Sequence, residues 1–424
     1  MRTGDLVLRA LAGYDGWIII GVVFLAAGLT IGTSNYAFGL FIEPLENSFG
    51  WRRTAISASL SFMAVGSLTG PMIGRAMDRY GARPIMVVSL IVFGSSFLLR
   101  PFIQDLWHLY ALSVLQFAGF SGTAMLPAGR LVGIWFPNSR GRAMGFATMG
   151  NNFGGLTMPL LAGLVMANAA GWPAIGTGEE STWKAAFVVI AAISFVLAFL
   201  ALVIVHERPV LRGSGDAARP EAPRPVLEGW TVREALSTRG FYAMALAMAL
   251  ATFTYSAVLP HVGAHLEIEG LPDGAVLTAV ALLATFGMAG KLLFGYVAER
   301  ITARRALMLT LTGQCVFILV MVVEPSQPLI WVSVPMYGLF MGSYGVLSTL
   351  VMQEAYGIRF FGSISGLAGM ASVVSLISGP LVAGASADGT GGYGLAFVGI
   401  AAMFVVAVVA LTQVPGPRPR TAAR

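Results

Sequence analysis

The chain has 424 residues, of which 56% are hydrophobic and only 11% carry a charge. Soluble domains carry roughly 25% charged residues, so the composition excludes an ordinary soluble protein and predicts one embedded in a membrane. The formal net charge of +6 would suit a nucleic-acid-binding protein, but the basic residues gather in alternate loops. That placement reports membrane orientation and argues against a nucleic-acid partner.

Apolar stretches long enough to cross a bilayer recur along the whole chain, since a membrane-spanning helix needs about 20 apolar residues. They begin near residues 17, 54, 84, 107, 143, 183, 240, 273, 305, 329, 360 and 392. The first runs from Trp17 to about Phe41, which is longer than the apolar part of a secretory signal. We therefore predict an all-α membrane protein with twelve transmembrane helices.

The second half of the chain repeats the pattern of the first half at one offset. Residues 74–83 and 295–304 share their glycine, acid and arginine positions, and residues 159–163 recur as 380–384. Both pairs are 221 positions apart, so the chain consists of two copies of one unit. In a membrane protein this repeat is typical of a transporter whose site lies between the halves.

The repeat predicts two pseudo-symmetric bundles of six helices, over residues 1–206 and 240–424. Residues 207–239 are rich in Pro, Arg and Glu and read as a cytoplasmic linker, in which Trp230 to Leu236 form a short helix. The polar end of the chain, from Pro415 to Arg424, reads as a short cytoplasmic tail.

The distribution of basic residues predicts the orientation. With the N-terminus placed in the cytoplasm, the outer loops hold only these four: Arg52, Arg53, Arg100 and Lys184. Since cytoplasmic loops carry the excess of Lys and Arg, we expect both termini on the cytoplasmic side of the cytoplasmic membrane. The single cysteine, Cys315, lies inside a predicted helix and can form no disulfide within the chain.

The repeated segment carries the most specific motif of the chain. Residues 74–83 resemble the signature loop between helices 2 and 3 of the major facilitator superfamily, and residues 295–304 resemble its degenerate copy between helices 8 and 9. This resemblance covers nearly the whole chain and implies that the loops act as a conformational latch on the cytoplasmic side. The latch residues would be Gly74, Asp78, Arg79, Gly81, Arg83, Glu299, Arg300 and Arg304.

Lys291 is the sharpest single candidate for a binding site. It lies inside the span that begins near residue 273, about two turns before Glu299. A lysine at that depth costs several kcal/mol unless it faces a cavity or a partner. It either binds an anion or snorkels to the inner interface. Two turns are about 11 Å, near the limit of that reach, and no acid is spaced to pair with Lys291 on its own helix, so we favour anion binding.

A narrower resemblance rests on three places. The spacing from Lys291 to Gly295 is similar to that of the helix-8 arginine in the monocarboxylate transporter family and in oxalate/formate antiporter-like proteins. Residues 15–17 resemble a shortened monocarboxylate signature, and residues 36–50 resemble the family's passage from helix 1 to helix 2. The resemblance implies a small organic anion as the substrate, held by Lys291.

The chain departs from these families at several positions. Lys291 replaces an arginine, so a bidentate fork becomes a point charge. Gly287 and Leu40 stand where animal members have an acid and a lysine. The second basic residue of oxalate-type carriers would fall near Ser372, and residues 360–384 hold no Lys or Arg. A single cation suits a monocarboxylate better than a dicarboxylate, because a second buried carboxylate would be unpaired.

Further polar and aromatic residues within the spans are candidates for the substrate site. They are Asn35, Tyr36, Asn152, Tyr255, Phe340 and Tyr344. Phe340 and Tyr344 are one helical turn apart and could form an aromatic wall. For each candidate, a hydrogen bond between helices is as good an interpretation as a substrate contact. We interpret Arg130 as a gate or topology residue.

The function that we predict is secondary transport of a monocarboxylate by alternating access, with or without a proton. The histidines have no metal-ligand company and there is no phosphate-cradling loop, so we expect neither an enzyme, a cofactor nor a metal site. We expect a monomer. The alternatives are an oxalate/formate-type anion exchanger, an exporter of a hydrophobic compound and, from another class, a non-transporting membrane sensor.

Overall fold

The computed structural model describes residues 3–168, 179–207, 228–323 and 327–416. The described part of the chain is built from helices and their connections, without strands. Most of the predicted linker, residues 208–227, lies outside the described residues, and so does the predicted tail from residue 417 onward.

The chain divides into two compact units. The first unit consists of residues 1–138, 149–229 and 358–362, and the second of residues 139–148, 230–357 and 363–424. Two short segments are thus exchanged relative to the predicted boundaries, and both lie where a helix begins.

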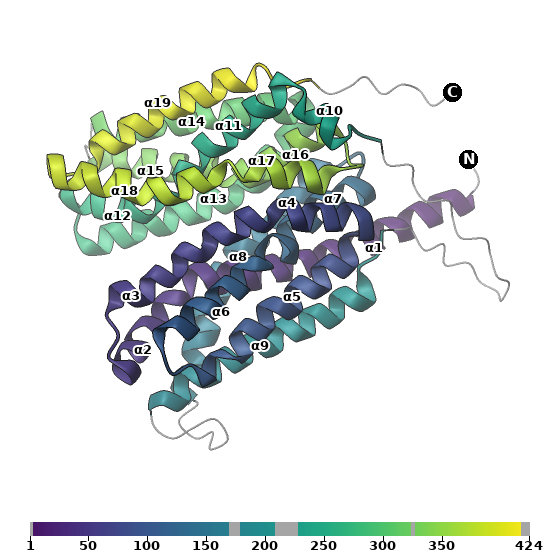
Figure 1. Ribbon diagram of the computed structural model, residues 1–424. Coiled ribbons are helices and arrows are strands. Elements are labelled where there is room, and N and C mark those ends of the chain that lie inside the picture. The colour runs from purple at the N-terminus through teal and green to yellow at the C-terminus, as the bar shows by residue number, and fades with distance from the viewer. Residues whose placement is uncertain (1–2, 169–178, 208–227, 324–326, 417–424) are drawn as a thin grey trace. The chain divides into compact units, whose positions relative to one another are not determined.

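The first unit holds the following helices (Figure 1): α1 (Thr3–Ile31), η1 (Gly32–Tyr36), η2 (Phe38–Phe41), α2 (Ile42–Phe49), α3 (Arg53–Ala58), η3 (Ser59–Phe62), α4 (Met63–Tyr80), α5 (Ala82–Leu98), η4 (Arg100–Phe102), α6 (Leu106–Ala118), η5 (Ser121–Met125), α7 (Leu126–Trp135), most of α8 (Arg140–Asn168) and α9 (Glu179–Ile204). Within this unit α5 packs against α9 and α6, and α1 packs against α9 and α7.

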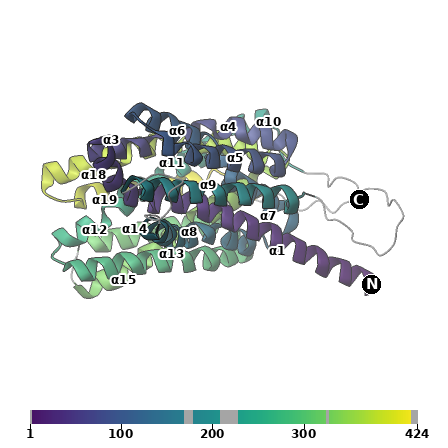
Figure 2. The same ribbon diagram turned by 90° about the horizontal axis from the view of Figure 1, so that it is seen from below.

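The second unit holds the helices of the other half, which Figures 1 and 2 together label apart from η7: α10 (Val232–Leu236), α11 (Arg239–Phe253), η7 (Thr254–Val258), α12 (Leu259–Ile268), α13 (Asp273–Ile301), α14 (Ala303–Val323), α15 (Gln327–Gly342), α16 (Tyr344–Tyr356), most of α17 (Phe361–Gly369), α18 (Ser372–Thr390) and α19 (Gly394–Leu411). Here α13 packs against α15, and α14 and α11 pack against α19. The predicted short helix at 230–236 is present as α10. Thr231 and Glu234 cap its N-terminus, because the side chain of each accepts a hydrogen bond from the backbone amide of the other.

The twelve predicted spans are confirmed as helical segments. Eleven of them are long and apolar enough to cross a bilayer. The remaining one is α8, a helix of 29 residues that carries Arg140 and Arg142 as well as Asn151 and Asn152. Its polar and glycine-rich sequence suits a helix that packs against other helices rather than against lipid.

Glycines let neighbouring helices approach closely in both units. A Cβ atom on Gly154 of α8 would overlap the backbone of Gly28 on α1, and one on Gly342 of α15 would overlap that of Gly287 on α13. Because apolar side chains gain nothing by leaving lipid for one another, such close van der Waals contact stabilises helix pairs in a membrane.

Three spans contain a π-helical turn. These turns are η1, η5 and η7. In η1 the amide of Ala37 donates to the carbonyl of Gly32 at 2.9 Å, which inserts one extra residue into the helix. The turns η1 and η7 lie 222 positions apart, one residue from the repeat offset, so both halves have the same irregularity. Such turns are frequent at functional sites because they redirect side chains.

Candidate functional site

Lys291 is buried in α13, with 8% of its surface exposed. Its Nζ donates a hydrogen bond to the carbonyl oxygen of Thr148 on α8 at 2.9 Å. Both residues belong to the second unit. A backbone carbonyl satisfies one donor of the ammonium but leaves its formal charge in place.

The segment of α8 that reaches Lys291 crosses α13 at glycines. A Cβ atom on Gly141 would overlap the carbonyl of Gly295, and one on Gly145 would lie 2.7 Å from the carbonyl oxygen of Lys291 itself. Gly141 and Gly145 are four residues apart, the spacing that brings two helix backbones into contact. Because α8 crosses α13 this closely, it covers Lys291.

The predicted aromatic residues have different neighbours from those we expected. Tyr344 begins α16, and its ring lies 6.0 Å from that of Tyr255 on η7. Phe340 lies in the last turn of α15. Its ring packs against those of Phe294 and Phe317, at 5.3 and 5.7 Å between ring centroids. The wall that the spacing of Phe340 and Tyr344 suggested is replaced by a Tyr255–Tyr344 pair, because the helix is interrupted between Gly342 and Tyr344.

Both tyrosines of that pair also hold the helix backbones together. The hydroxyl of Tyr255 donates to the carbonyl of Met341 at 3.0 Å, and that of Tyr344 donates to the carbonyl of Met248 at 3.1 Å. These contacts join η7 to α15, and α16 to α11. The alternative interpretation of such residues, a hydrogen bond between helices, therefore applies to both in this structure.

Three polar candidates lie in the first unit. Asn35 and Tyr36 occupy the π-helical turn η1, and both are exposed, Tyr36 by 46%. Asn152 lies half-buried on α8. The ring of Tyr36 lies against α8, because a Cβ atom on Gly155 would be 3.0 Å from it.

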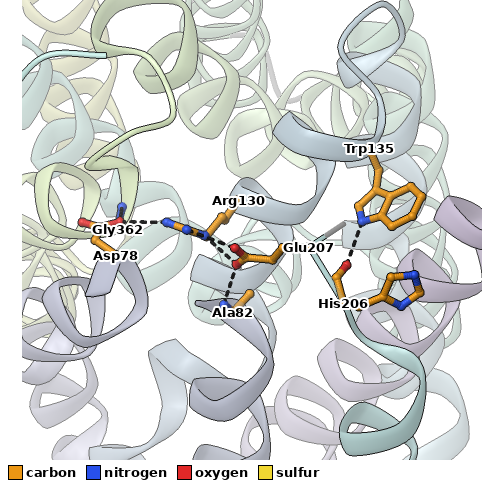
Figure 3. A network of polar contacts seen from close by, with 7 residues as sticks. All are labelled: Asp78, Ala82, Arg130, Trp135, His206, Glu207 and Gly362. Atoms are coloured by element: carbon orange, nitrogen blue, oxygen red, sulfur yellow. Dashed lines mark hydrogen bonds and ion pairs between the residues drawn. The ribbon is translucent and has the colours of Figure 1, made fainter. Parts of the chain in front are cut away.

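Asp78, at the end of α4, belongs to a buried polar network (Figure 3). Its carboxylate accepts a hydrogen bond from the amide of Gly362 at 3.0 Å and one from Arg130 at 3.4 Å. Its side chain is only 5% exposed. Gly362 is the second residue of α17, so the carboxylate faces a helix N-terminus, where the free amides favour a negative charge.

Arg130 joins Asp78 to a second carboxylate, Glu207 (Figure 3). Its Nε and Nη2 donate to the two oxygens of Glu207 at 2.7 and 3.1 Å, the bidentate geometry that suits a guanidinium. Glu207 also accepts the amide of Ala82, the first residue of α5, at 2.7 Å. Two carboxylates thus surround one arginine, and the N-termini of α5 and α17 offset the remaining negative charge.

The second motif copy repeats the contact to a helix N-terminus. Glu299 accepts hydrogen bonds from the amide and the Nε of Arg142 at 2.9 and 3.0 Å. Arg142 is the third residue of α8, and it lies in the second unit with Glu299. Asp78 and Glu299 are 221 positions apart, so each copy of the motif places its acid at the start of a helix from the other half of the sequence.

The motif glycines allow these approaches. A Cβ atom on Gly362 would overlap the carbonyl of Gly74, just as one on Gly141 would overlap that of Gly295. The first glycine of each motif copy therefore lies where another helix crosses it closely. A larger residue there would separate the two helices and remove the acid from its amide.

The loop positions differ between the two copies in one respect. Gly81 has φ 93°, a conformation that glycine adopts readily. Thr302, at the equivalent position, has φ 113° and is the only non-glycine residue with positive φ in the described chain. After the turn, Ala303 donates its amide to the carboxylate of Glu354 at 3.0 Å, as Ala82 does to Glu207.

The remaining latch candidates lie outside these networks. Arg79 and Arg83 are exposed, and Arg79 lies over the ring of Tyr80 at 5.2 Å. Arg300 bonds to Tyr296 on its own helix, and Arg304 donates to the carbonyl of Val414. Their latch roles stay predictions.

Sequence reasoning missed the partners of these residues. Glu207 and Glu354 were not site candidates, although each follows or ends a long apolar helix, and Arg142 carried no signal beyond its charge. Arg100, which we placed in an outer loop, is 4% exposed and lies inside the first unit. Its position just after α5 resembled a loop because a short 3₁₀ turn, Arg100–Phe102, follows the helix.

The described residues contain no group of three or more His, Cys, Asp or Glu side chains that could hold a metal ion. The residues brought together at Lys291 and at the two motif copies instead offer cationic and amide donors. Such groups bind or exchange anionic oxygens.

Comparison with known proteins gives a family and named relatives. A model of the Major Facilitator Superfamily matches residues 23–380. Monocarboxylate transporter 11 of Homo sapiens is 26% identical over 396 residues, which is 90% of this chain and 79% of the relative. Monocarboxylate transporter 10 of Danio rerio is 25% identical over 397 residues, or 90% and 74% of the two chains.

Solved structures share the fold. The proton:xylose symporter XylE, bound to 6-bromo-6-deoxy-D-glucose, matches with a TM-score of 0.74 at 13% identity, over 95% of this chain and 96% of that chain. The human organic anion transporter MFSD10 matches with a TM-score of 0.67 at 15% identity, over 93% and 99% of the two chains. At these identities the likeness concerns the fold alone.

Proposed function

Because this chain belongs to the major facilitator superfamily, we propose that it is a secondary active transporter of a small monocarboxylate, which it carries by alternating access across the cytoplasmic membrane. The names of its relatives support the substrate class, since two of them are monocarboxylate transporters that align over 90% of this chain.

The observation that carries the proposal is the burial of Lys291. An ammonium group within a membrane-spanning helix is costly, and such residues generally mark a substrate or ion path. Its Nζ donates a hydrogen bond to the Thr148 carbonyl, and a carboxylate that reached Lys291 would accept a charge-assisted hydrogen bond from the same ammonium. Tyr255 and Tyr344, whose rings lie 6.0 Å apart in the same unit, would favour an apolar group on the acid.

The two motif copies provide the conformational part of the proposal. Asp78 and Glu299 each bind a backbone amide at the start of a helix, and such contacts can form and break without a change in chain connectivity. We assign them to a latch that holds one conformation, on the side that the positive-inside pattern makes cytoplasmic.

Uptake by reconstituted protein tests the function. Proteoliposomes containing the purified carrier should accumulate radiolabelled lactate or pyruvate faster than protein-free liposomes, and unlabelled acid should compete. Repeating the assay with an imposed pH gradient, and then with internal anion, separates proton symport from exchange. If no carboxylate is transported or bound under any of these conditions, the substrate proposal fails.

The alternatives give different results in the same assay. An oxalate-type exchanger would require internal anion and would prefer oxalate to lactate. An exporter of a hydrophobic compound would show no carboxylate flux but would lower the accumulation of an apolar dye. A non-transporting sensor would bind its ligand without any flux.

A further inference from the structure

A small polar cavity lies inside the first unit, and neither Lys291 nor a residue of either motif copy lines it. Its polar lining consists of Thr33, Ser34, Ser59, Arg100, Ser113 and Gln116. Phenylalanine and leucine side chains from η2, α2, η3, α5, α6 and α9 form the rest of the wall. No carboxylate lines it.

Arg100 is the charged group of this cavity, and its surroundings do not neutralise it. One Nη donates to Gln116 at 2.5 Å, and the guanidinium lies over the rings of Phe97 and Phe187 at 4.2 and 5.1 Å. Within the described residues no carboxylate forms an ion pair with it. Hydrogen bonds and ring faces stabilise a cation only in part, so a buried charge normally has a counter-ion as well.

Two donors at the cavity have no partner among the described residues. They are Nε of Arg100 and Oγ1 of Thr33. The side chains of both residues are buried, since only 4% of Arg100 and 2% of Thr33 are exposed. A buried N–H or O–H without an acceptor is rare in a folded protein and points to a bound water or ion.

The neighbouring groups are fixed in a donating arrangement. Gln116 uses its oxygen to accept from Arg100 and its nitrogen to donate to Ser34 at 2.8 Å. The oxygen of Gln116 is therefore already engaged, and the cavity presents the guanidinium and a hydroxyl rather than a free carboxylate or amide oxygen. This chemistry suits an anion.

The size of the cavity limits what the anion can be. Within the cavity, the centre of a water-sized sphere can move through a volume of about 10 Å³. That is room for about one water-sized particle. A carboxylic acid with several heavy atoms does not fit. We propose that this cavity is an anion site that binds a single small inorganic ion, chloride, as the counter-ion of Arg100.

The site is distinct from the substrate site proposed at Lys291, and it does not depend on what the protein transports. Through Arg100 and Thr33, the ion would join η4 to η1, the π-helical turn that also carries Asn35 and Tyr36. Its occupancy should therefore be measurable as stability of the whole chain, without any transport.

Thermal unfolding of the purified full-length protein tests the proposal. The protein is kept at constant ionic strength in potassium gluconate, which is replaced stepwise by chloride or bromide. We expect a saturable rise in melting temperature of a few degrees with either halide, because a ligand that binds only the folded state stabilises it. A wild-type protein that melts at the same temperature in gluconate and in chloride would overturn the proposal.

Variants locate the effect. Arg100→Gln should abolish the halide-dependent rise, whereas Arg53→Gln should retain it, because Arg53 is a surface arginine with its side chain 68% exposed. If Arg100→Gln does not fold, Thr33→Val preserves the shape and should raise the half-maximal halide concentration about tenfold. A rise that persists in Arg100→Gln, or that disappears only in Lys291→Gln, would place the ion elsewhere.

Crystals of the wild-type protein soaked in bromide give a direct readout that needs no variant. An anomalous peak within hydrogen-bond distance of Arg100 Nε is the expected result. Bromide peaks found only at other positions would contradict the proposal.

Discussion

Three lysine and arginine side chains are almost fully buried in the described part of the chain, and each has a different kind of partner. Arg130 binds two carboxylates, Lys291 binds a backbone carbonyl, and Arg100 faces two rings, an amide and a small cavity. Their exposed fractions are 5%, 8% and 4%. The partner rather than the burial suggests the role: ion-paired support for Arg130, a substrate contact for Lys291 and an inorganic anion site for Arg100.

Substitutions of Lys291 test whether its ammonium contacts the substrate. Lys291→Ala should reduce carboxylate binding below detection while the protein still folds, because each hydrogen bond to a charged group contributes about 1.5–3 kcal/mol. Lys291→Arg should retain part of the affinity. Ligand-dependent thermal shift and uptake measure both effects. Lys184→Ala, at the only other lysine, is the control, and wild-type transport by Lys291→Ala would show that the charge does not contact the substrate.

Substitutions in the turn after each motif copy test the backbone strain at positive φ. Gly81→Ala should lower the free energy of unfolding by about 1–3 kcal/mol, because a side chain is strained at positive φ. Thr302→Gly should raise the melting temperature, since Thr302 already carries that strain at φ 113°. Gly399→Ala, on a helix with open space around its Cβ, is the control. A neutral Gly81→Ala would mean that the turn relaxes.

Elements of the two halves correspond closely but not completely. Both first spans carry a π-helical turn, η1 and η7, and both motif copies place an acid at the start of a helix. The carboxylate that accepts the first amide after each motif turn differs between the halves. Ala82 donates to Glu207, whereas Ala303 donates to Glu354, a residue of α16. The repeat therefore conserves the backbone arrangement, while individual side chains supply the charges.

Substitutions of the two motif acids test the latch contact. Asp78→Asn should slow transport and increase the population that is open to the cytoplasm, with substrate affinity unchanged, because the neutral amide holds the α17 N-terminus less strongly. Glu299→Gln should have the same kind of effect. Labelling of a cytoplasmic cysteine probe reports the opening, and Arg305→Gln, at an exposed residue just after the second motif copy, is the control. An altered affinity with unchanged turnover would contradict the latch.

The ion-pair network beneath the loop gives a stability prediction. Arg130→Gln should destabilise the protein by about 3–5 kcal/mol, because it leaves Asp78 and Glu207 buried together without their cation. Adding Glu207→Gln should recover part of the loss. Thermal unfolding of the two single variants and the double variant measures the coupling. Strictly additive effects would show that Arg130 and Glu207 do not interact.

In the transport that we propose, the buried charges of the whole molecule limit which acids are accepted. A second carboxylate would lose its hydration on entering the protein and would need a second cation. Arg100 is a further buried cation that the sequence placed in a loop, but its cavity has room for only about one water-sized particle, so it cannot receive a second carboxylate of the substrate. Lys291 therefore remains the base that we propose for the substrate, although it is not the only buried base, and we predict a preference for monocarboxylates.

Competition measures this preference. Lactate, pyruvate or an apolar 2-hydroxy acid should displace a bound monocarboxylate more effectively than oxalate or malonate, because only one carboxylate meets a fixed positive charge. Purified protein in detergent and a radiolabelled acid are sufficient for the assay. If oxalate binds more tightly than lactate, a second basic residue contributes to the site.

The sequence alone determined the membrane environment, the twelve spans, the twofold repeat, the superfamily and the burial-prone position of Lys291. The membrane environment, the spans and the repeat follow from composition, length and spacing, which depend on each residue's surroundings along one helix. The superfamily follows from the resemblance of residues 74–83 and 295–304 to its signature loop. Only the tertiary structure decided that Glu207 pairs with Arg130, that Tyr344 meets Tyr255 instead of Phe340, and that Arg100 is enclosed. Those partners are up to 89 positions apart (Tyr255 and Tyr344), and helix crossings at glycines bring them together, so no local spacing could reveal them.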